Sequence, residues 1–435
     1  MTLIGAAILS CLIAIVLLGS RRIAVLSISV GILFLTQGLS IDFFGINLYA
    51  MRILVLFGML RIVLRKEFNI SFANPIDRYF VILYSVIISI SILRYTNEST
   101  YQIAAAADAT CSYFVFRALI SDLEDIKWLL NRLAILLVPF FGAVLVERVT
   151  LQNPFALVGA NLYISDFREG IPRCTGSFRH AILLGSFAAA FLPLYIGFSL
   201  NSLGNLKAKM GAAICVGIVF LSNSGGPLSS VAIGIMGWGF WIFREKMRSV
   251  RVLLVIMIAV LAVIMKAPIW ALPAKISNLT GGGGWHRYYL VEMAIQSLGD
   301  WWLAGMSIEK TKDWFPYIIQ TGGADITNEF ISFGLSSGIL AVIFFVVLLT
   351  KSFRAVGEHL AVTRSIGSDK SDEFLIWGIG VTLLVHISNW FGVSYFDQIK
   401  FIWYLHVSMV AMLADRVRVY DRGLNIVSDI VKSEA

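Results

Sequence analysis

Repeated apolar runs, each long enough to cross a lipid bilayer, constrain the fold of this chain more than any other feature. Hydrophobic residues make up 58% of the 435-residue sequence and charged residues only 14%, a composition far outside the range of soluble proteins. The runs, about 13 by the length needed for a membrane span, cover residues 2–19, 23–39, 46–64, 76–94, 102–120, 128–147, 181–200, 210–222, 228–243, 252–270, 329–350, 374–393 and 398–415. The sequence therefore predicts an all-α, polytopic integral membrane protein of about 12–13 transmembrane helices, with residues 1–435 as a single transmembrane domain.

Basic residues between these runs predict how the chain is oriented. They occupy alternate connections. The short connections at 40–45, 95–101, 223–227 and 394–397 contain no Lys or Arg, although Arg94 ends the run that precedes the second of them. Because short cytoplasmic loops carry an excess of Lys and Arg, the basic connections are expected to face the cytoplasm. The two long hydrophilic loops, 148–180 and 271–328, are then extracytoplasmic, and their arginines require an explanation.

The net charge of +8 does not indicate a nucleic-acid partner, because the cations are scattered singly between apolar runs. We find no phosphate-binding glycine loop, dinucleotide fingerprint or zinc-ligand spacing in the sequence. We therefore expect no cofactor and no metal. Energy for any chemistry has to arrive with the substrate.

The loop at 271–328 contains the richest pattern. Four glycines, Gly281–Gly284, precede an amphipathic helical pattern over residues 285–298. Glycines allow a ligand to approach the backbone, and the first turn of a helix offers free N–H donors, so Arg287 in that turn would reinforce an anion site. A flexible hinge with Arg287 as a solvated surface charge explains the same residues equally well.

Charged residues at the ends of both loops are further candidates. Arg173, Arg179 and His180 lie close to the membrane surface, where they would meet a lipid headgroup or serve as interfacial anchors. Asp325 and Glu329 are four residues apart and would share one face if the next helix already starts there. Either carboxylate could take a proton from an acceptor hydroxyl, or simply stabilise a helix N-terminus.

The order of several short motifs resembles the O-antigen ligase and polysaccharide polymerase superfamily. The likeness covers roughly residues 170–345. The pieces are Arg173-x-x-Gly176-x-Phe178-x-His180, a proline-containing apolar span, Leu221-Ser-Asn-Ser224-Gly-Gly226-Pro227, Arg287 in a Trp-rich loop, Thr327-Asn328-Glu329, and then Gly334 and Gly338.

The resemblance implies a multi-spanning membrane glycosyltransferase fold of the GT-C-like kind, acting at the periplasmic face. It implies that Arg173 and Arg287 engage the donor diphosphate. Two departures matter: Ser224-Gly225-Gly226 stands where the family usually has Ser-Arg-Gly, so one cation is missing, and Thr327 stands where a histidine often precedes the final Asn. The second departure favours a polymerase over a ligase and leaves His286, Asp325 or Glu329 as substitutes.

We therefore expect a polymerase of bacterial surface polysaccharide, O-antigen or exopolysaccharide, in the inner membrane. It would transfer a glycan from an undecaprenyl-diphosphate-linked oligosaccharide to the sugar hydroxyl of a second lipid-linked repeat, with inversion. Membrane lipids and a chain-length regulator protein are the other expected partners. An O-antigen ligase acting on lipid A–core, and a lipid or polysaccharide transporter or flippase, remain as alternatives. The expected catalytic residues are Arg173, Arg287, Glu329 and Asp325, and the expected substrate-binding residues are Arg179, His180, His286, Asn328, Tyr288 and Trp285.

Overall fold

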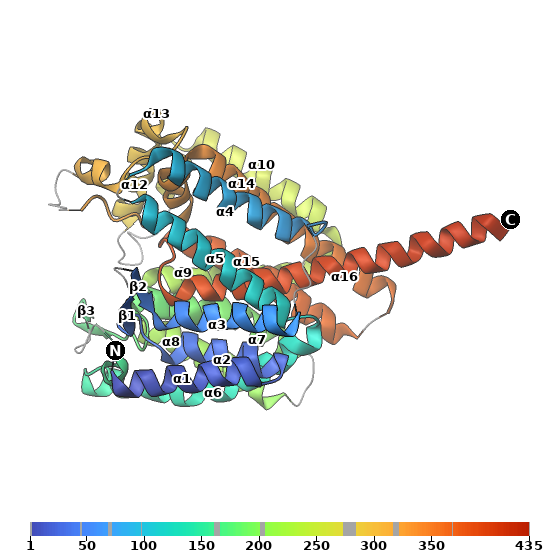
Figure 1. Ribbon diagram of the computed structural model, residues 1–435. Helices are drawn as coiled ribbons and strands as arrows, with labels where there is room; N and C mark the ends of the chain where they lie inside the picture. Colours follow the sequence, from blue (N-terminus) through green and yellow to red (C-terminus); the bar gives the residue numbers. More distant parts are fainter. Residues whose placement is uncertain are drawn as a thin grey trace.

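The computed structural model consists mainly of helices that run side by side (Figure 1). It describes residues 2–43, 46–67, 72–96, 98–160, 166–200, 205–272, 284–315, 322–367 and 369–434, with the backbone alone for 421–434. The longer helices are α1 (Leu3–Leu18), α2 (Arg21–Phe34), α3 (Ala50–Arg65), α4 (Pro75–Arg94), α5 (Ser99–Leu119), α6 (Leu123–Thr150), α7 (Ala181–Leu200), α8 (Leu206–Leu221), α9 (Gly225–Gly239), α10 (Met247–Ile264), α12 (Gly284–Gln296), α14 (Glu329–Ser365), α15 (Lys370–Trp390) and α16 (Gln398–Glu434).

Every predicted apolar run overlaps one of these helices. Within the described residues, six helical segments are long and apolar enough to cross a membrane: Pro75–Arg94, Leu123–Thr150, Ala181–Leu200, Gly225–Ile264, Glu329–Ser365 and Lys370–Trp390. The protein is thus an all-α membrane protein. The segment Gly225–Ile264 joins α9 and α10 through the 3-10 helix η2 (Phe240–Lys246).

Two short hairpins interrupt the helical pattern, and the sequence analysis did not predict them. Strands β1 (Ser40–Phe43) and β2 (Ile46–Tyr49) pair antiparallel. The predicted run 23–39 therefore extends past the end of α2, and the predicted run 46–64 begins before the start of α3. Strands β3 (Asp166–Arg168) and β4 (Ile171–Arg173) form the second hairpin inside the loop 148–180. The alternation of apolar and polar residues in Ile46-Asn47-Leu48-Tyr49 is a strand pattern that was available in the sequence.

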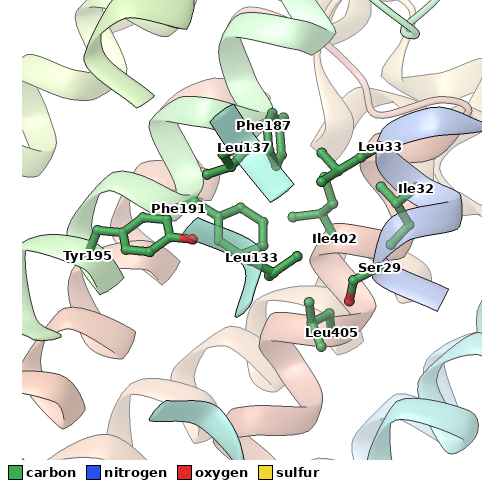
Figure 2. Close-up of a pocket in the computed structure, with 10 residues that line it drawn as sticks. All are labelled: Ser29, Ile32, Leu33, Leu133, Leu137, Phe187, Phe191, Tyr195, Ile402 and Leu405. Carbon is green, nitrogen blue, oxygen red and sulfur yellow. The ribbon is translucent and has the colours of Figure 1, made fainter. Parts of the chain in front are cut away.

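Helix α7 lies at the centre of the bundle. Nearly all of its residues are buried, as expected for a helix that is apolar on every face, and it packs against α8, α9 and α15. Phe187, Phe191 and Tyr195 of α7 point toward α2, α6 and α16 around a small apolar void (Figure 2). This void is part of the core, since a volume of about 10 Å³ leaves no room for a substrate.

Loops and short elements gather at one end of the bundle. Figure 1 shows the hairpins, α12 and α13 (Leu298–Trp301) at that end, whereas α16 projects from the other end. The remaining 3-10 helices are η1 (Pro154–Val158), η3 (Ile269–Ala271) and η4 (Ile308–Trp314). We call the first end the loop end and the second the α16 end.

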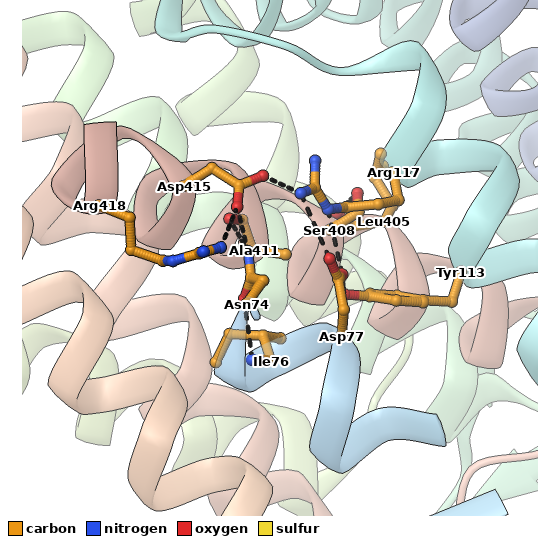
Figure 3. Close-up of polar contacts among 10 residues, drawn as sticks. All are labelled: Asn74, Ile76, Asp77, Tyr113, Arg117, Leu405, Ser408, Ala411, Asp415 and Arg418. Carbon is orange, nitrogen blue, oxygen red and sulfur yellow. Dashed lines mark hydrogen bonds and ion pairs between the residues drawn. The ribbon is translucent and has the colours of Figure 1, made fainter. Parts of the chain in front are cut away.

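A buried ion-pair network joins α4, α5 and α16 near the α16 end (Figure 3). The guanidinium of Arg117 contacts Asp77, 3.1 Å away, and Asp415. The hydroxyl of Tyr113 donates to Asp77, and the side-chain amide of Asn74 donates to Asp415 at 2.8 Å. The network fixes these three helices relative to one another.

Helix α14 is broken near the loop end. Ser337 and Gly338 have non-helical backbone angles, and Gly338 has a φ of 77°. The N–H of Ile339 donates to the carbonyl of Trp302 at 2.7 Å, so the loop supplies a hydrogen bond that the broken helix lacks. A Cβ at Gly338 would lie 2.6 Å from the carbonyl oxygen of Leu303, which explains the glycine.

Candidate substrate-binding site

A cavity of about 330 Å³ lies at the loop end, where the hairpin β3–β4 and the first turns of α9 and α12 come together. Six of the ten residues that line it have polar or basic side chains. The lining residues are Arg168, Arg173, Ile182, Ser224, Gly225, Gly226, His286, Arg287, Thr327 and Gly392.

The hairpin β3–β4 presents two arginines to the cavity. Its turn is Glu169-Gly170, and both residues have positive φ, 54° and 77°, as in the tight turns that match the twist of paired strands. Asp166 pairs with Arg173 across the hairpin, and side chains two residues apart share a face. Arg168, Arg173 and Asp166 therefore lie on the same face of the hairpin.

Arg173 is held in place by two contacts. Its guanidinium donates to the carboxylate of Asp166 at 3.2 Å and to the hydroxyl of Ser224 at 3.1 Å. Its Nε is buried and has no hydrogen-bond partner within the part of the chain that the structure describes. The same holds for Oγ1 of Thr327 on the cavity wall. Buried polar atoms without partners are uncommon in folded proteins.

Arg287 lies in the first turn of α12, as predicted from the sequence, and its side chain lines the cavity. Its guanidinium passes through a narrow notch between two glycines. A Cβ at Gly226 would lie 3.4 Å from Nη2, and a Cβ at Gly392 would lie 3.1 Å from Cζ. Among the described residues no carboxylate forms an ion pair with Arg287, so its charge is available to a bound anion.

The first turn of α9 adds backbone donors to the same wall. Ser224 is the residue before this helix, but its side chain does not cap it; instead, its hydroxyl donates to the carbonyl of Ser222 while accepting from Arg173. The N–H groups at the start of α9 are therefore not capped by Ser224 and lie beside Gly225 and Gly226 on the cavity wall. Free N–H groups and the positive end of the helix dipole favour an anion here.

The electrostatics of the cavity favour negative charge. Partial burial lowers the pKa of Arg287, and the nearby positive charge of Arg168 lowers it further. Burial also lowers the pKa of Arg173, against the opposing effect of Asp166. Three arginines thus face one cavity, and a multiply charged anion such as a diphosphate would relieve both the desolvation and the repulsion.

His286 is the imidazole among the residues that line the cavity. Its Nε2 lies 3.1 Å from the backbone carbonyl of Asp325, and its ring stacks on Phe315 with centroids 4.4 Å apart. A carbonyl oxygen only accepts, so Nε2 carries the proton. In the neutral ring Nδ1 is then the acceptor.

The candidate acids lie outside the cavity lining. Glu329 is the first residue of α14, and its carboxylate accepts the N–H of Tyr395 at 2.6 Å. Asn328 caps the same helix by accepting the N–H groups of Phe330 and Ile331. Because α14 begins at Glu329, the exposed Asp325 precedes the helix and does not share a helical face with Glu329. The condition for a shared face, a helix that already includes Asp325, is therefore not met.

Four further candidates also lie outside the cavity lining. The guanidinium of Arg179 is exposed and lies 4.0 Å from the carboxylate of Asp397. His180 accepts the N–H of Ile182 through Nδ1 at 3.2 Å, at the start of α7. Trp285 stacks on Tyr289 with ring centroids 5.0 Å apart, and Tyr288 is partly buried on α12. A role in substrate binding stays a prediction for all four, and Gly281–Gly283 lie outside the described residues.

Sequence reasoning missed Arg168. The motif resemblance left one cation unaccounted for, because Gly225 stands where an arginine is usual. Arg168 brings a third cation to the cavity from a different segment. The signal was present in the sequence, since Glu169-Gly170 between short strand-like segments indicates a two-residue hairpin that places Arg168 beside Arg173.

Comparison with known proteins does not identify this chain. No family model matches it, and no curated protein sequence matches it significantly.

The glycine notch around Arg287 gives a test of this geometry. In Gly392→Ala the new methyl group would displace the guanidinium by a few tenths of an ångström. Since small misplacements of a positioned group reduce rates strongly, we expect roughly a tenfold loss of activity with little loss of stability. Gly239→Ala, at the far end of α9 with nothing near its Cβ, is the control. Equal activities of the two variants in a transfer assay would contradict the assigned position of Arg287.

Proposed function

We propose that the protein is a bacterial membrane glycosyltransferase that polymerises surface polysaccharide. Its donor is an oligosaccharide linked to undecaprenyl diphosphate, and its acceptor is a sugar hydroxyl of a second lipid-linked repeat. The observation that carries the proposal is the convergence of Arg168, Arg173 and Arg287 on one cavity at the loop end.

The chemistry of the cavity supports a diphosphate ligand. Guanidinium groups bind phosphate oxygens through paired hydrogen bonds, and the first turn of α9 offers backbone N–H donors to the same anion. The volume of about 330 Å³ accommodates the headgroup, while the rest of the donor would extend outside the cavity. Arg173 and Arg287 would each contact the diphosphate, and Arg168 would add charge.

The proposed reaction is a direct displacement. An acceptor hydroxyl attacks the anomeric carbon of the donor sugar, the bond from that carbon to the phosphate oxygen breaks, and the configuration inverts. The electron pair of the broken bond stays on the lipid diphosphate, where the arginines stabilise the developing charge. The hydroxyl proton passes to Nδ1 of His286, which we favour as the base over Asp325 and Glu329 because it lines the cavity.

Charge distribution supports a periplasmic site in the inner membrane. The basic residues Lys207 and Arg248 lie in the first turns of α8 and α10, at the ends of these helices away from the cavity, and the positive-inside rule assigns that side to the cytoplasm. The overlap of every predicted run with a helix supports a count of about 12–13 spans, for which the proposed arrangement is GT-C-like. The loops 148–180 and 271–328 would then face the periplasm.

A reconstituted assay tests the proposal. Purified protein in liposomes is given an undecaprenyl-diphosphate-linked oligosaccharide, and the products are separated by mass. We expect longer glycans together with an equal amount of released lipid diphosphate, because each transfer frees one leaving group. Protein with both Arg173→Ala and Arg287→Ala is the control and should give neither product.

The alternatives predict different results in this assay. A ligase would consume the donor only when lipid A–core is supplied as the acceptor. A transporter or flippase would move the intact donor between leaflets without releasing lipid diphosphate. Either result would overturn the proposed polymerase.

A further inference from the structure

A second cavity, of about 550 Å³, lies between α4, α14 and α16 toward the α16 end. It is separate from the candidate site. Four cations line it, Arg78, Lys351, Arg354 and Arg418, together with the single carboxylate Glu358. Nothing in the proposed transfer reaction uses these residues.

Two of the four cations are already neutralised. Arg354 donates to Glu358 at 2.6 Å, and Arg418 lies 3.6 Å from Asp415, one of the two carboxylates of the network in Figure 3. Arg78 and Lys351 form no ion pair within the described part of the chain. Excess positive charge in this cavity therefore resides on these two side chains.

A shared aromatic ring keeps the two free cations together. The guanidinium of Arg78 lies 5.3 Å from the ring centroid of Tyr79, and the ammonium of Lys351 lies 5.9 Å from the same centroid. Arg78 belongs to α4 and Lys351 to α14, so two packed helices bring the charges to one place.

The depth of the cavity matches a membrane surface. Arg78 lies in the first turn of α4, and Arg94 at the other end of this unbroken helix donates to the carbonyl of Ala304 in the loop 271–328. The helix between these two arginines corresponds to about 24 Å at the usual rise per residue, most of the thickness of the hydrocarbon core. Apolar side chains, including Val362, Ala414 and Val417, form the rest of the wall. Cations beside an apolar wall at this depth suit an amphiphile with an anionic head.

We infer that this cavity binds the phosphate headgroup of an anionic phospholipid, between Arg78 and Lys351, in the leaflet opposite the candidate site. The phosphate diester would accept hydrogen bonds from both cations, and the acyl chains would lie against the lipid-facing sides of α4 and α14. Basic pockets between transmembrane helices are suited to such headgroups. The inference is independent of the proposed transfer reaction.

Native mass spectrometry of the full chain in detergent tests this inference. The probes are phosphatidylglycerol, phosphatidylcholine and soluble glycerol phosphate. We expect phosphatidylglycerol to bind and the Arg78→Gln, Lys351→Gln double variant to bind it about thirtyfold more weakly, since each cation contributes about one factor of five. The Lys207→Gln, Arg248→Gln double variant loses the same charge from exposed positions outside the cavity and should keep its affinity.

Three results would overturn the inference. The first is equal affinity for phosphatidylglycerol and phosphatidylcholine, and the second is an equal loss in the two double variants, which would indicate a nonspecific charge effect. The third is binding of glycerol phosphate as tight as that of the lipid, which would identify a soluble phosphate compound as the ligand. Thermal unfolding of both variants without added lipid checks that they are folded.

Discussion

Replacement of Arg287 by alanine is expected to lower the rate of glycan transfer about a hundredfold, because a cation facing the developing charge of the leaving diphosphate contributes on the order of 3 kcal/mol. The side chain forms no ion pair among the described residues, so its removal should not destabilise the protein. The initial rate of lipid diphosphate release from purified enzyme measures the effect.

Two further variants sharpen the Arg287 experiment. Arg287→Lys keeps the charge but loses the planar pair of donors, so an intermediate rate is expected. Arg251→Ala removes an exposed arginine of α10 whose side chain, among the described residues, donates to the carbonyl of Met247, and it should retain full activity. An Arg287→Ala enzyme that reaches the membrane and makes polymer of unchanged length and yield would exclude the proposed role.

Replacement of Glu147 by alanine is expected to destabilise the segment that follows Arg173. The buried carboxylate accepts the N–H groups of Thr175 and Gly176, both at 2.8 Å. Its loss would leave two buried donors unsatisfied, at a cost of about 3 kcal/mol. We expect a lower midpoint of thermal unfolding, and a slower transfer rate because Arg173 would no longer be held against Ser224.

Glu124→Ala provides the matched control for Glu147. Glu124 lies on the same helix, is 67% exposed and pairs with Lys127. Exposed ion pairs contribute little, so this variant should change the free energy of unfolding by less than about 1 kcal/mol. Similar unfolding midpoints for the two variants would contradict the anchoring role of Glu147.

The positions of most helices could be predicted from this sequence because the length of each apolar run is enough to identify a helix. Residues 181–200 were predicted as a span and form α7 with the same bounds. The amphipathic pattern after Gly284 was predicted as a helix and forms α12. The hairpins were missed because strands of three or four residues leave a weak signal beside long apolar runs.

Part of the candidate site was also predictable. Arg173 and Arg287 line the same cavity, as expected from their positions in two long loops on a side whose short connections lack basic residues; their role in binding a diphosphate stays a prediction. Individual side-chain contacts were harder to predict from the sequence. Asn328 caps α14, and Asn immediately before an apolar helix is a typical cap, yet the motif resemblance drew attention to a binding role instead.

The clustering of arginines that would bind an anion lowers the stability of the folded protein. Asp166 neutralises part of the positive charge that Arg168, Arg173 and Arg287 bring together, so the empty protein retains an internal repulsion that its native state has to tolerate. A bound dianion removes that repulsion, and mass action then favours the folded form in proportion to occupancy. In the proposed enzyme, the form with bound substrate is therefore more stable than the form without it, and the substrate stabilises the loops that bind it.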